Sequence, residues 1–448
     1  MNLCSGKGLF MKRKRIFLVT ISVIFVLFVG TVLYAILKDD DAYRYYTGLG
    51  EKISVAPDDS KIAFSYYVDG NESIYTANPD GTHVKQITNS TNQQDHHPKY
   101  SPDGKKLVYV SKDAEGIQML RGINEDGSEG RQLTDSDIHV TDVIFSPDGE
   151  IVYFVAIEAE EFKKGERSRE GFDLYSIEAD GSHMKKLTDT DHFSMNHLTL
   201  SPDGSAIYYS EFDGVEERIY SYSPEEGTVN TKPSILSKKI ENAQSFYEPQ
   251  LSSDGRYLVF TEVSKESEES SLFKYDLFLL DLKTQNVERL TDLKTAVTSP
   301  TFFHKENKIA FLENTNWPGN PAEYQLMTID TTTHNIEVVK LDAPQSAGGN
   351  RLIQMLDRGV NGLTIAILYM VLFGLLSVYL HYYHKSKAYL PSIVSFAIAI
   401  LTVVAGFVVG RMVDPWYGIG LWMLAVGIFG CSIVVVLFVF IFKRFAKK

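Results

Sequence analysis

The stretch Ser101-Pro-Asp-Gly-Lys-Lys-Leu-Val-Tyr-Val110 decides the fold, because related copies of it recur along the chain. The clear copies are SPDGEIVYFV from Ser146, SPDGSAIYYS from Ser201 and SSDGRYLVFT from Ser252, and the weaker ones are APDDSKIAFS from Ala56 and FHKENKIAFL from Phe303. Their aligned turn positions are 45 to 55 residues apart. A period in this range, with strands around tight turns, is typical of the blades of a β-propeller.

Each copy of the phrase predicts two strands joined by a turn. Asp-Gly favours a turn because glycine accepts a positive φ and aspartate bonds its own nearby backbone. The run that follows, such as Leu107–Val110, is apolar and β-branched and suits a buried strand. Two more strands follow in each repeat, and the last one ends on a motif such as Lys186-Leu-Thr-Asp189. Four strands repeated six times predict an all-β, six-bladed β-propeller.

The phrase and its closing Leu-Thr-Asp resemble the repeats of the TolB-type propellers of the Tol-Pal envelope system. The resemblance covers about two thirds of the chain. It implies the propeller fold and a role in binding a protein, a peptide or another component of the cell envelope. Only a dozen residues separate the first apolar segment from the first repeat, where TolB itself carries a separate amino-terminal domain. We therefore expect a membrane-anchored relative and not TolB itself.

Apolar segments flank the repeats on both sides. Residues 16–37 form an uncharged run preceded by Lys12-Arg-Lys-Arg15, which is long enough to cross a bilayer, with a cleaved signal peptide as the alternative. Three more spans are predicted near 363–382, 390–410 and 419–442. The predicted domains are a cytoplasmic basic segment (1–15), a transmembrane anchor (16–37), a linker (38–49), the propeller (50–342), a second linker (343–360) and three transmembrane helices with a cytoplasmic tail (361–448).

The distribution of charge predicts the orientation. Lys385 and Lys387 lie between two predicted spans, and Lys443 and Arg444 lie at the tail. Because cytoplasmic loops carry excess lysine and arginine, we expect a multi-pass cell-membrane protein with both termini inside and the propeller outside. All acidic residues except Asp414 lie within 38–358, which argues against binding of nucleic acid. The small-residue motif from Gly406 to Gly410 suggests close helix packing and a homo-oligomer formed through the carboxyl-terminal helices.

A ring of polar residues is predicted around the central channel. Four residues before each phrase, the first strand of each blade begins near the channel. The residues at that position are Lys52, His97, Asp142, His197, Glu248 and Ser299. Two histidines and two carboxylates, His97, Asp142, His197 and Glu248, suit a divalent metal. The alternative is that a wet channel is polar by default. The sequence indicates no other cofactor.

Long inserts separate the second and third strands of three repeats, at 158–172, 264–274 and 313–323. Strand parity places them on the same face as both ends of the propeller. We therefore expect Lys163, Arg169 and Trp317, which lie in these inserts, to contact a partner.

Two functions remain open. The chain contains no G-x-S-x-G elbow, P-loop or dinucleotide fingerprint. The first hypothesis is a non-enzymatic propeller that binds a protein, peptide or envelope component as a scaffold or sensor. The alternative is a metal-dependent hydrolase or lactonase-like enzyme that uses the channel ring.

Overall fold

The protein divides into two compact units, Asp41–Gly349 and Met1–Asp40 together with Asn350–Lys448. The computed structural model describes every residue except 1, 2, 39, 40, 91, 166, 167, 169, 191, 242, 243, 268, 347, 349, 350, 385, 386, 447 and 448. The first unit holds the repeats and is called the repeat unit. The second holds the long apolar helices and is called the helical unit.

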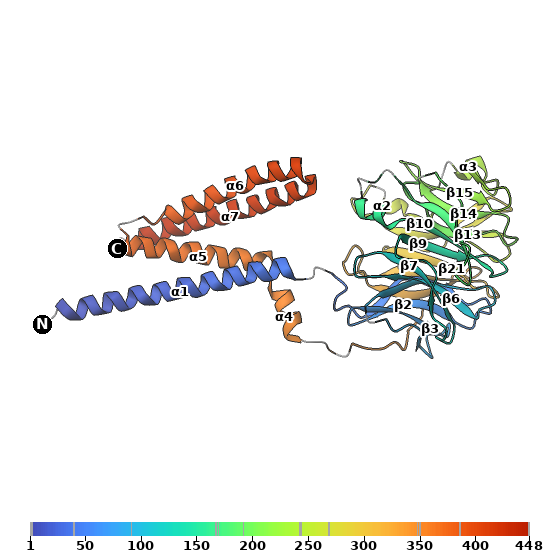
Figure 1. Cartoon of the computed structure of the whole chain (residues 1–448), viewed down its shortest axis with the longest axis horizontal. Coiled ribbons are helices and arrows are strands. Elements are labelled where there is room, and N and C mark those ends of the chain that lie inside the picture. Colours follow the sequence, from blue (N-terminus) through green and yellow to red (C-terminus); the bar gives the residue numbers. More distant parts are fainter. Residues whose placement is uncertain are drawn as a thin grey trace. The chain divides into compact units, whose positions relative to one another are not determined.

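Strands of the repeat unit pair antiparallel in successive groups of four (Figure 1). The first two groups are β1 (Gly48–Val55), β2 (Ile62–Val68), β3 (Asn71–Ala77) and β4 (Lys85–Gln86), then β5 (Gln94–Tyr100), β6 (Lys106–Lys112), β7 (Gln118–Asn124) and β8 (Arg131–Gln132). The next two are β9 (Ile138–Phe145), β10 (Ile151–Glu158), β11 (Asp173–Glu178) and β12 (Lys185–Lys186), then β13 (Asn196–Leu200), β14 (Ile207–Phe212), β15 (Glu217–Ser223) and β16 (Thr228–Asn230). The last two are β17 (Tyr247–Leu251), β18 (Tyr257–Val263), β19 (Tyr275–Asp281) and β20 (Asn286–Arg289), then β21 (Ala296–Phe302), β22 (Lys308–Asn314), β23 (Tyr324–Asp330) and β24 (Ile336–Val338).

The repeated phrase forms the turn between the first two strands of a group, as predicted. In the second group Gly104 has a φ of 71°, and its N–H donates to the carbonyl of Ser101 at 2.9 Å. The carboxylate of Asp103 accepts from the Ser101 hydroxyl at 2.6 Å and from the backbone N–H of Lys105 at 3.1 Å. Aspartate therefore fixes the turn that glycine permits.

The Leu-Thr-Asp motif has a structural explanation in the threonine. The Thr134 hydroxyl accepts the backbone N–H of Leu120 at 2.9 Å, and Thr188 does the same for Leu174. The fourth strand of these groups is only two residues long, so the threonine continues the bonding of the third strand beyond it. The side chain thereby pairs a buried backbone donor that the short strand does not reach.

Apolar clusters lie between successive groups, and one of them joins the last group to the first. That cluster packs Leu49, Ile53 and Phe64 against Phe303 and Leu326, all 6% exposed or less. A strand contact at the same place pairs β1 with β23 through Leu49 and Tyr324. The groups therefore form a β-propeller-like arrangement in which the last group packs against the first.

The phrase turns of neighbouring groups touch one another. A Cβ added at Gly204 would meet the ring of Pro147, from the preceding phrase, at 3.1 Å. The same pairing of glycine with the preceding proline recurs at three other turns, in the pairs Gly104–Pro57, Gly149–Pro102 and Gly255–Pro202. We call these four contacts the inner joints.

The contact between the last group and the first, which we call the closing joint, differs. Asp59 occupies the glycine position with a φ of 62°. Its carboxylate accepts the backbone N–H groups of His304 and Lys305, each at 2.7 Å. The departure of the first phrase from the repeat is thus a specific contact with the last phrase.

Both ends of the repeat unit meet at the turn Asp69–Gly70. The N–H of Gly70 donates to the carbonyl of Tyr46 at 2.9 Å in the leading segment, and the Ser346 hydroxyl of the trailing segment donates to Asp69. The two ends therefore leave the repeat unit together, as strand parity predicts.

The helical unit contains α1 (Leu3–Leu37), α4 (Arg351–Gly359), α5 (Gly362–Tyr383), α6 (Leu390–Met412) and α7 (Pro415–Ala446). Four of these, α1 from Arg13 onward, α5, α6 and α7, are long and apolar enough to cross a membrane. Helix α4 lies within the segment 343–360, which the sequence predicts to be a linker. The shorter helices α2 (Ala159–Lys164) and α3 (Lys238–Glu241) and the 3-10 turn Lys265–Ser267 belong to the repeat unit.

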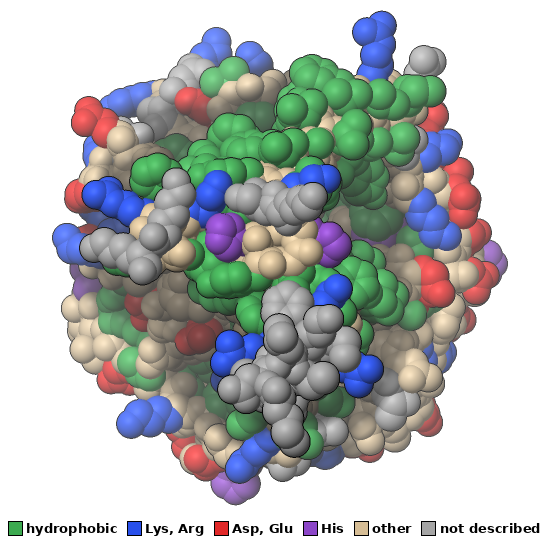
Figure 2. Space-filling model, turned by 90° about the vertical axis from the view of Figure 1, so that its left-hand side faces the viewer, with side chains coloured by type: hydrophobic (Ala, Val, Ile, Leu, Met, Phe, Trp, Pro, Cys, Tyr) green, Lys and Arg blue, Asp and Glu red, His purple; other side chains and the backbone are tan. Residues whose placement is uncertain are grey.

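Helix α1 begins and helix α7 ends at the same end of the helical unit (Figure 1). Lys14 of α1 lies 5.9 Å from the ring centroid of Tyr383, where α5 ends. Lys443 of α7 lies 4.8 Å from the ring centroid of Tyr389, where α6 begins. Figure 2, which looks toward this end, shows hydrophobic side chains gathered over the helices with lysine and arginine side chains beside them.

The glycine motif of α6 is used within the chain. A Cβ on Gly418 of α7 would lie 2.7 Å from the Cα of Gly410 and 2.8 Å from the carbonyl oxygen of Gly406. Only glycine permits so close an approach of two helices. The small-residue motif therefore packs α6 against α7 within the chain.

Candidate functional site

The structure brings all six predicted channel residues together. They line one small cavity of about 20 Å³, and Lys99, Gln250, Pro300 and Thr301 complete its wall. Each predicted residue comes from the first strand of a different group, because the position repeats with the phrase. The cavity is therefore the centre of the channel.

A β-bulge in the first strand turns most of these side chains inward. The pairing of first and second strands shifts register at His97, His197, Glu248 and Ser299. These four residues have φ values of 52° to 59°, which residues other than glycine rarely adopt. A bulge inserts an unpaired residue and redirects its side chain, so the repeated backbone strain aims the ring at the channel.

Several ring residues hold neighbouring strands together. A carboxylate oxygen of Asp142 accepts the N–H of Leu198 in the next group at 2.7 Å. The Ser299 hydroxyl accepts the N–H of Ile53 at 3.1 Å across the closing joint, and Ser54 accepts that of Tyr100 at 3.2 Å. Buried backbone donors need such acceptors, which explains polar residues at these positions without any ligand.

An ion pair dominates the electrostatics of the channel. Glu248 contacts the ammonium of Lys52, accepts from the Ser299 backbone and accepts from the Thr298 hydroxyl at 2.7 Å. Burial opposes its ionisation, but Lys52 and then His197 outweigh burial and lower the pKa of Glu248 to about 2. Burial likewise opposes the charge of Lys52, yet Glu248 and Glu51 raise its pKa.

The histidines of the ring are neutral at pH 7. Burial and the Lys52 charge lower the pKa of His197 to about 4 and that of His97 well below its ordinary value. The described residues contain no group of three or more His, Cys, Asp or Glu side chains placed to hold a metal ion. The donors proposed for a metal instead have protein partners: Asp142 binds a backbone N–H, and Glu248 binds an ammonium.

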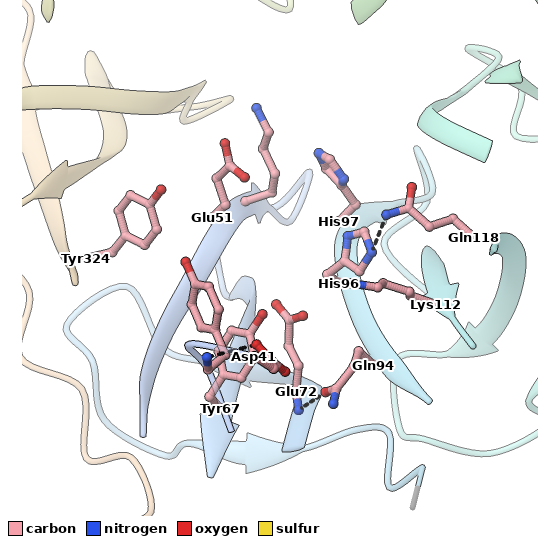
Figure 3. A pocket seen from close by; sticks show the side chains of 13 residues that line it. Asp41, Glu51, Tyr67, Glu72, Gln94, His96, His97, Lys112, Gln118 and Tyr324 are labelled. Carbon is pink, nitrogen blue, oxygen red and sulfur yellow. Dashed lines mark hydrogen bonds between the residues drawn. The ribbon is translucent and has the colours of Figure 1, made fainter. Parts of the chain in front are cut away.

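A wider pocket of about 250 Å³ lies beside the ring and shares Lys52 and His97 with it (Figure 3). Its wall comes from the leading segment, from several strands of the first two groups and from β23. The side chains that matter below are those of Glu51, Tyr67, Glu72, His96, Lys112 and Tyr324. In Figure 3, Glu51 and Tyr324 on one side and His97 and Gln118 on the other surround the same space. We call this space the mouth pocket.

Charges of both signs line the mouth pocket. Burial, together with the charges of Glu51 and Asp95, raises the pKa of Glu72 to about 7 against its hydrogen bond from Tyr67. Burial lowers the pKa of His96 to about 4, and its Nε2 lies 3.3 Å from the side-chain amide nitrogen of Gln118. Glu51 and Lys112 are exposed. The pocket thus offers an exposed carboxylate, an ammonium and tyrosine hydroxyls to a polar ligand.

The two predicted partner-contacting residues that the structure describes, Lys163 and Trp317, lie on separate features. Lys163 lies on α2 and pairs with Glu160 at 3.3 Å. The Trp317 indole N–H donates to the carbonyl of Phe273 at 2.7 Å, and its ring packs edge-on against Tyr275. Trp317 therefore joins the last insert to the insert of the preceding group. Arg169 lies outside the described residues.

Sequence reasoning missed two kinds of site residue. Lys99 and Gln250 stand two positions after the predicted ring residues, and alternation along a strand would have pointed to them. Lys112, Gln118 and Tyr324 reach the mouth pocket from the ends of second and third strands. Nothing in the repeat distinguishes those positions, because each comes from a different strand or group.

Comparisons with known proteins agree with this fold. The sequence model of the TolB beta propeller domain matches residues 47–171. An uncharacterized peptidase of Bacillus subtilis, YuxL, is 25% identical over 185 residues, which cover 41% of this chain and 24% of that relative. The uncharacterized protein Atu1656 of Agrobacterium fabrum is 28% identical over 163 residues, which cover 36% of this chain and 54% of that relative. The matched regions thus span about a quarter and about half of the two relatives.

Among solved structures, TolB from Acinetobacter baumannii superposes with a TM-score of 0.49 at 20% identity, over 64% of this chain and 65% of that one. The repeated phrase and the match of the domain model agree: residues 47–171 of this chain belong to a TolB-type β-propeller domain.

Proposed function

We propose that the protein is a membrane-anchored, extracytoplasmic six-bladed propeller that binds a protein, peptide or envelope component as a scaffold or sensor. The groups of four strands would each be one blade, and the four apolar helices would be the anchor. The basic residues Lys14 and Lys443 lie at the same end of the helical unit, which favours cytoplasmic termini and an external propeller.

The mouth pocket is the observation that carries the binding role. The channel behind it is narrow, and its carboxylates already pair with Lys52 and with backbone donors. The pocket, in contrast, is over ten times larger and presents Glu51 and Lys112 to solvent. A ligand with both charged and hydrogen-bonding groups, as a peptide segment has, fits such a wall. The inserts that carry Lys163 and Trp317 would extend the contact surface.

The enzymatic alternative rests on the convergence of His97, Asp142, His197 and Glu248 on one cavity. Its weakness is that Lys52 supplies the positive charge that a metal would supply there. Metal analysis of the purified full chain and of the double variant His97→Ala, His197→Ala distinguishes the two. A stoichiometric metal in the parent that the variant loses would favour the enzyme.

Site-specific photocrosslinking in native membranes tests the binding role. A photoreactive residue replaces Glu51 or Lys112 at the mouth pocket, or Lys105 at the phrase turn that follows β5. Lys105 is a matched control, because it is exposed and lies at the opposite end of the strand that carries His96. We expect light-dependent adducts from positions 51 and 112 and none from 105. Adducts from 105 alone would contradict the proposal.

A further inference from the structure

Helix α4 is amphipathic, and its apolar side is the more exposed one, whereas a surface helix of a soluble protein buries its apolar side. In its sequence, RLIQMLDRG, the apolar residues Leu352, Ile353, Met355 and Leu356 fall on one side of the helix, and the polar residues fall on the other. The apolar side chains are exposed: Leu352 by 72%, Met355 by 68% and Leu356 by 54%. The polar Gln354 and Asp357 are more buried than they are. Water is an unfavourable neighbour for such an apolar face.

Contacts within the helical unit hold α4 at the ends of two candidate spans. The Tyr34 hydroxyl, near the end of α1, donates to the carboxylate of Asp357 at 2.6 Å. The ammonium of Lys38 lies 3.5 Å from the carbonyl oxygen of Val360. Only Val360 and Asn361 separate α4 from α5. The polar side of α4 thus faces α1, and its apolar side faces away.

We propose that α4 lies in the interfacial layer of a lipid bilayer, with Leu352, Met355 and Leu356 inserted below the headgroups. The inference rests on the proposed membrane anchoring. Continuity with α5 places the apolar face where a bilayer surface would be, and Arg351 and Arg358 lie together along one edge of that face. Their guanidinium groups suit lipid phosphates while the apolar residues enter the acyl boundary. An interfacial helix here fixes the trailing tether of the propeller to the membrane surface.

Depth-dependent fluorescence quenching tests this placement in the full chain. Cys4 and Cys431 are replaced by serine, and a single cysteine at Met355, Gln354 or Ile400 carries an environment-sensitive fluorophore. Gln354 is the matched control on the other side of α4, and Ile400, 64% exposed on α6, tests the spans themselves. The protein is reconstituted in phosphatidylcholine–phosphatidylglycerol vesicles with a doxyl quencher either near the headgroup or near the chain end.

We expect the label at Met355 to be blue-shifted and quenched several-fold more by the shallow quencher than the label at Gln354. The label at Ile400 should respond most to the deep quencher. A responsive Ile400 with an unquenched Met355, whether exposed to water or shielded by protein, would overturn the inference and leave the membrane anchor standing. Equal quenching at Met355 and Gln354 would also overturn it. An unresponsive Ile400 would overturn the anchor itself.

Discussion

The inner joints and the closing joint of the propeller both hold neighbouring groups together, but they do so with different chemistry. At the inner joints a glycine lies against the proline of the preceding phrase, as Gly204 does against Pro147. At the closing joint the carboxylate of Asp59 accepts two backbone N–H groups, and the channel behind it holds the Lys52–Glu248 ion pair. Close packing of glycine on proline joins the first five groups in sequence, whereas charge and hydrogen bonding join the last group to the first.

The largest effect should come from Glu248, which links the fifth and sixth groups to the first. Replacing Glu248 with glutamine leaves the buried ammonium of Lys52 without its ion pair, at a cost of about 3–5 kcal/mol in the free energy of unfolding. Chemical denaturation of the detergent-solubilised full chain, followed by the β-sheet circular dichroism signal, measures this loss. Glu115→Gln, on an exposed loop, should change little.

The same substitution should alter the acid response. The folded pKa of Glu248, about 2, lies below its ordinary value of 4.5. Its stabilisation is therefore fully present above pH 4.5 and is lost as the pH falls toward 2. The difference in stability between parent and Glu248→Gln should shrink over that range. A difference that stays constant would show that Glu248 is not ionised in the fold.

Asp59→Ala should give the next largest effect. It removes two charge-assisted hydrogen bonds and leaves the N–H groups of His304 and Lys305 without an acceptor, which costs about 2–4 kcal/mol. The neighbouring Asp58→Ala is the matched control, since Asp58 is exposed and its carboxylate accepts from the backbone N–H and the hydroxyl of Ser60 in its own turn. Equal losses of stability for the two variants would show that Asp59 contributes no more than an ordinary turn residue does.

Gly204→Ala tests an inner joint. Alanine disfavours the φ of 72°, and its Cβ would press on Pro147, so we expect a loss on the order of 1–3 kcal/mol. Gly116→Ala shares the positive φ, 83°, but its Cβ would meet no atom within 4 Å. The difference between their melting temperatures isolates the contact of the joint. Identical shifts would show that the contact of Gly204 with Pro147 contributes nothing to stability.

The smallest effects should come from two serines whose hydroxyls accept a backbone N–H of the next group. Ser54 does so between the first two groups, and Ser299 does so between the last group and the first. Ser54→Ala removes the acceptor for Tyr100, and Ser299→Ala removes the acceptor for Ile53. Each should cost about 1 kcal/mol in the free energy of unfolding. Similar losses would show that the closing joint differs from the inner joints only in its turn and in the ion pair. A much larger loss for Ser299→Ala would show that the hydrogen bonds near the channel differ as well.

The sequence was sufficient for the strands and for the ring, because both repeat. A turn with a fixed period marks each strand pair, and counting back from it finds residues such as His97 and His197 that the bulge then turns inward. The mouth pocket does not repeat, so its residues could not be found this way. Asp59 stands where other copies have glycine, and its role could not be predicted because its partners lie some 245 residues away in the chain.

Helix α4 escaped prediction for another reason. Nine residues of mixed polarity resemble a linker, and their amphipathic pattern spans only a few turns. The contact of Tyr34 with Asp357, which holds the helix against α1, joins residues far apart in sequence. Tertiary contacts of this kind are invisible to a local reading of propensity.

Asp59 also gives the chain a way to tell its last repeat from the others. The first four phrases carry proline where the last carries His304, and proline has no N–H to offer. The first five carry aspartate where the last carries Lys305, so Asp59 would meet a like charge at any of those turns. Only the final phrase accepts it. Premature closure on a fragment of the array is therefore penalised, and a repeat gained or lost within the array leaves this recognition between the first and last phrases intact.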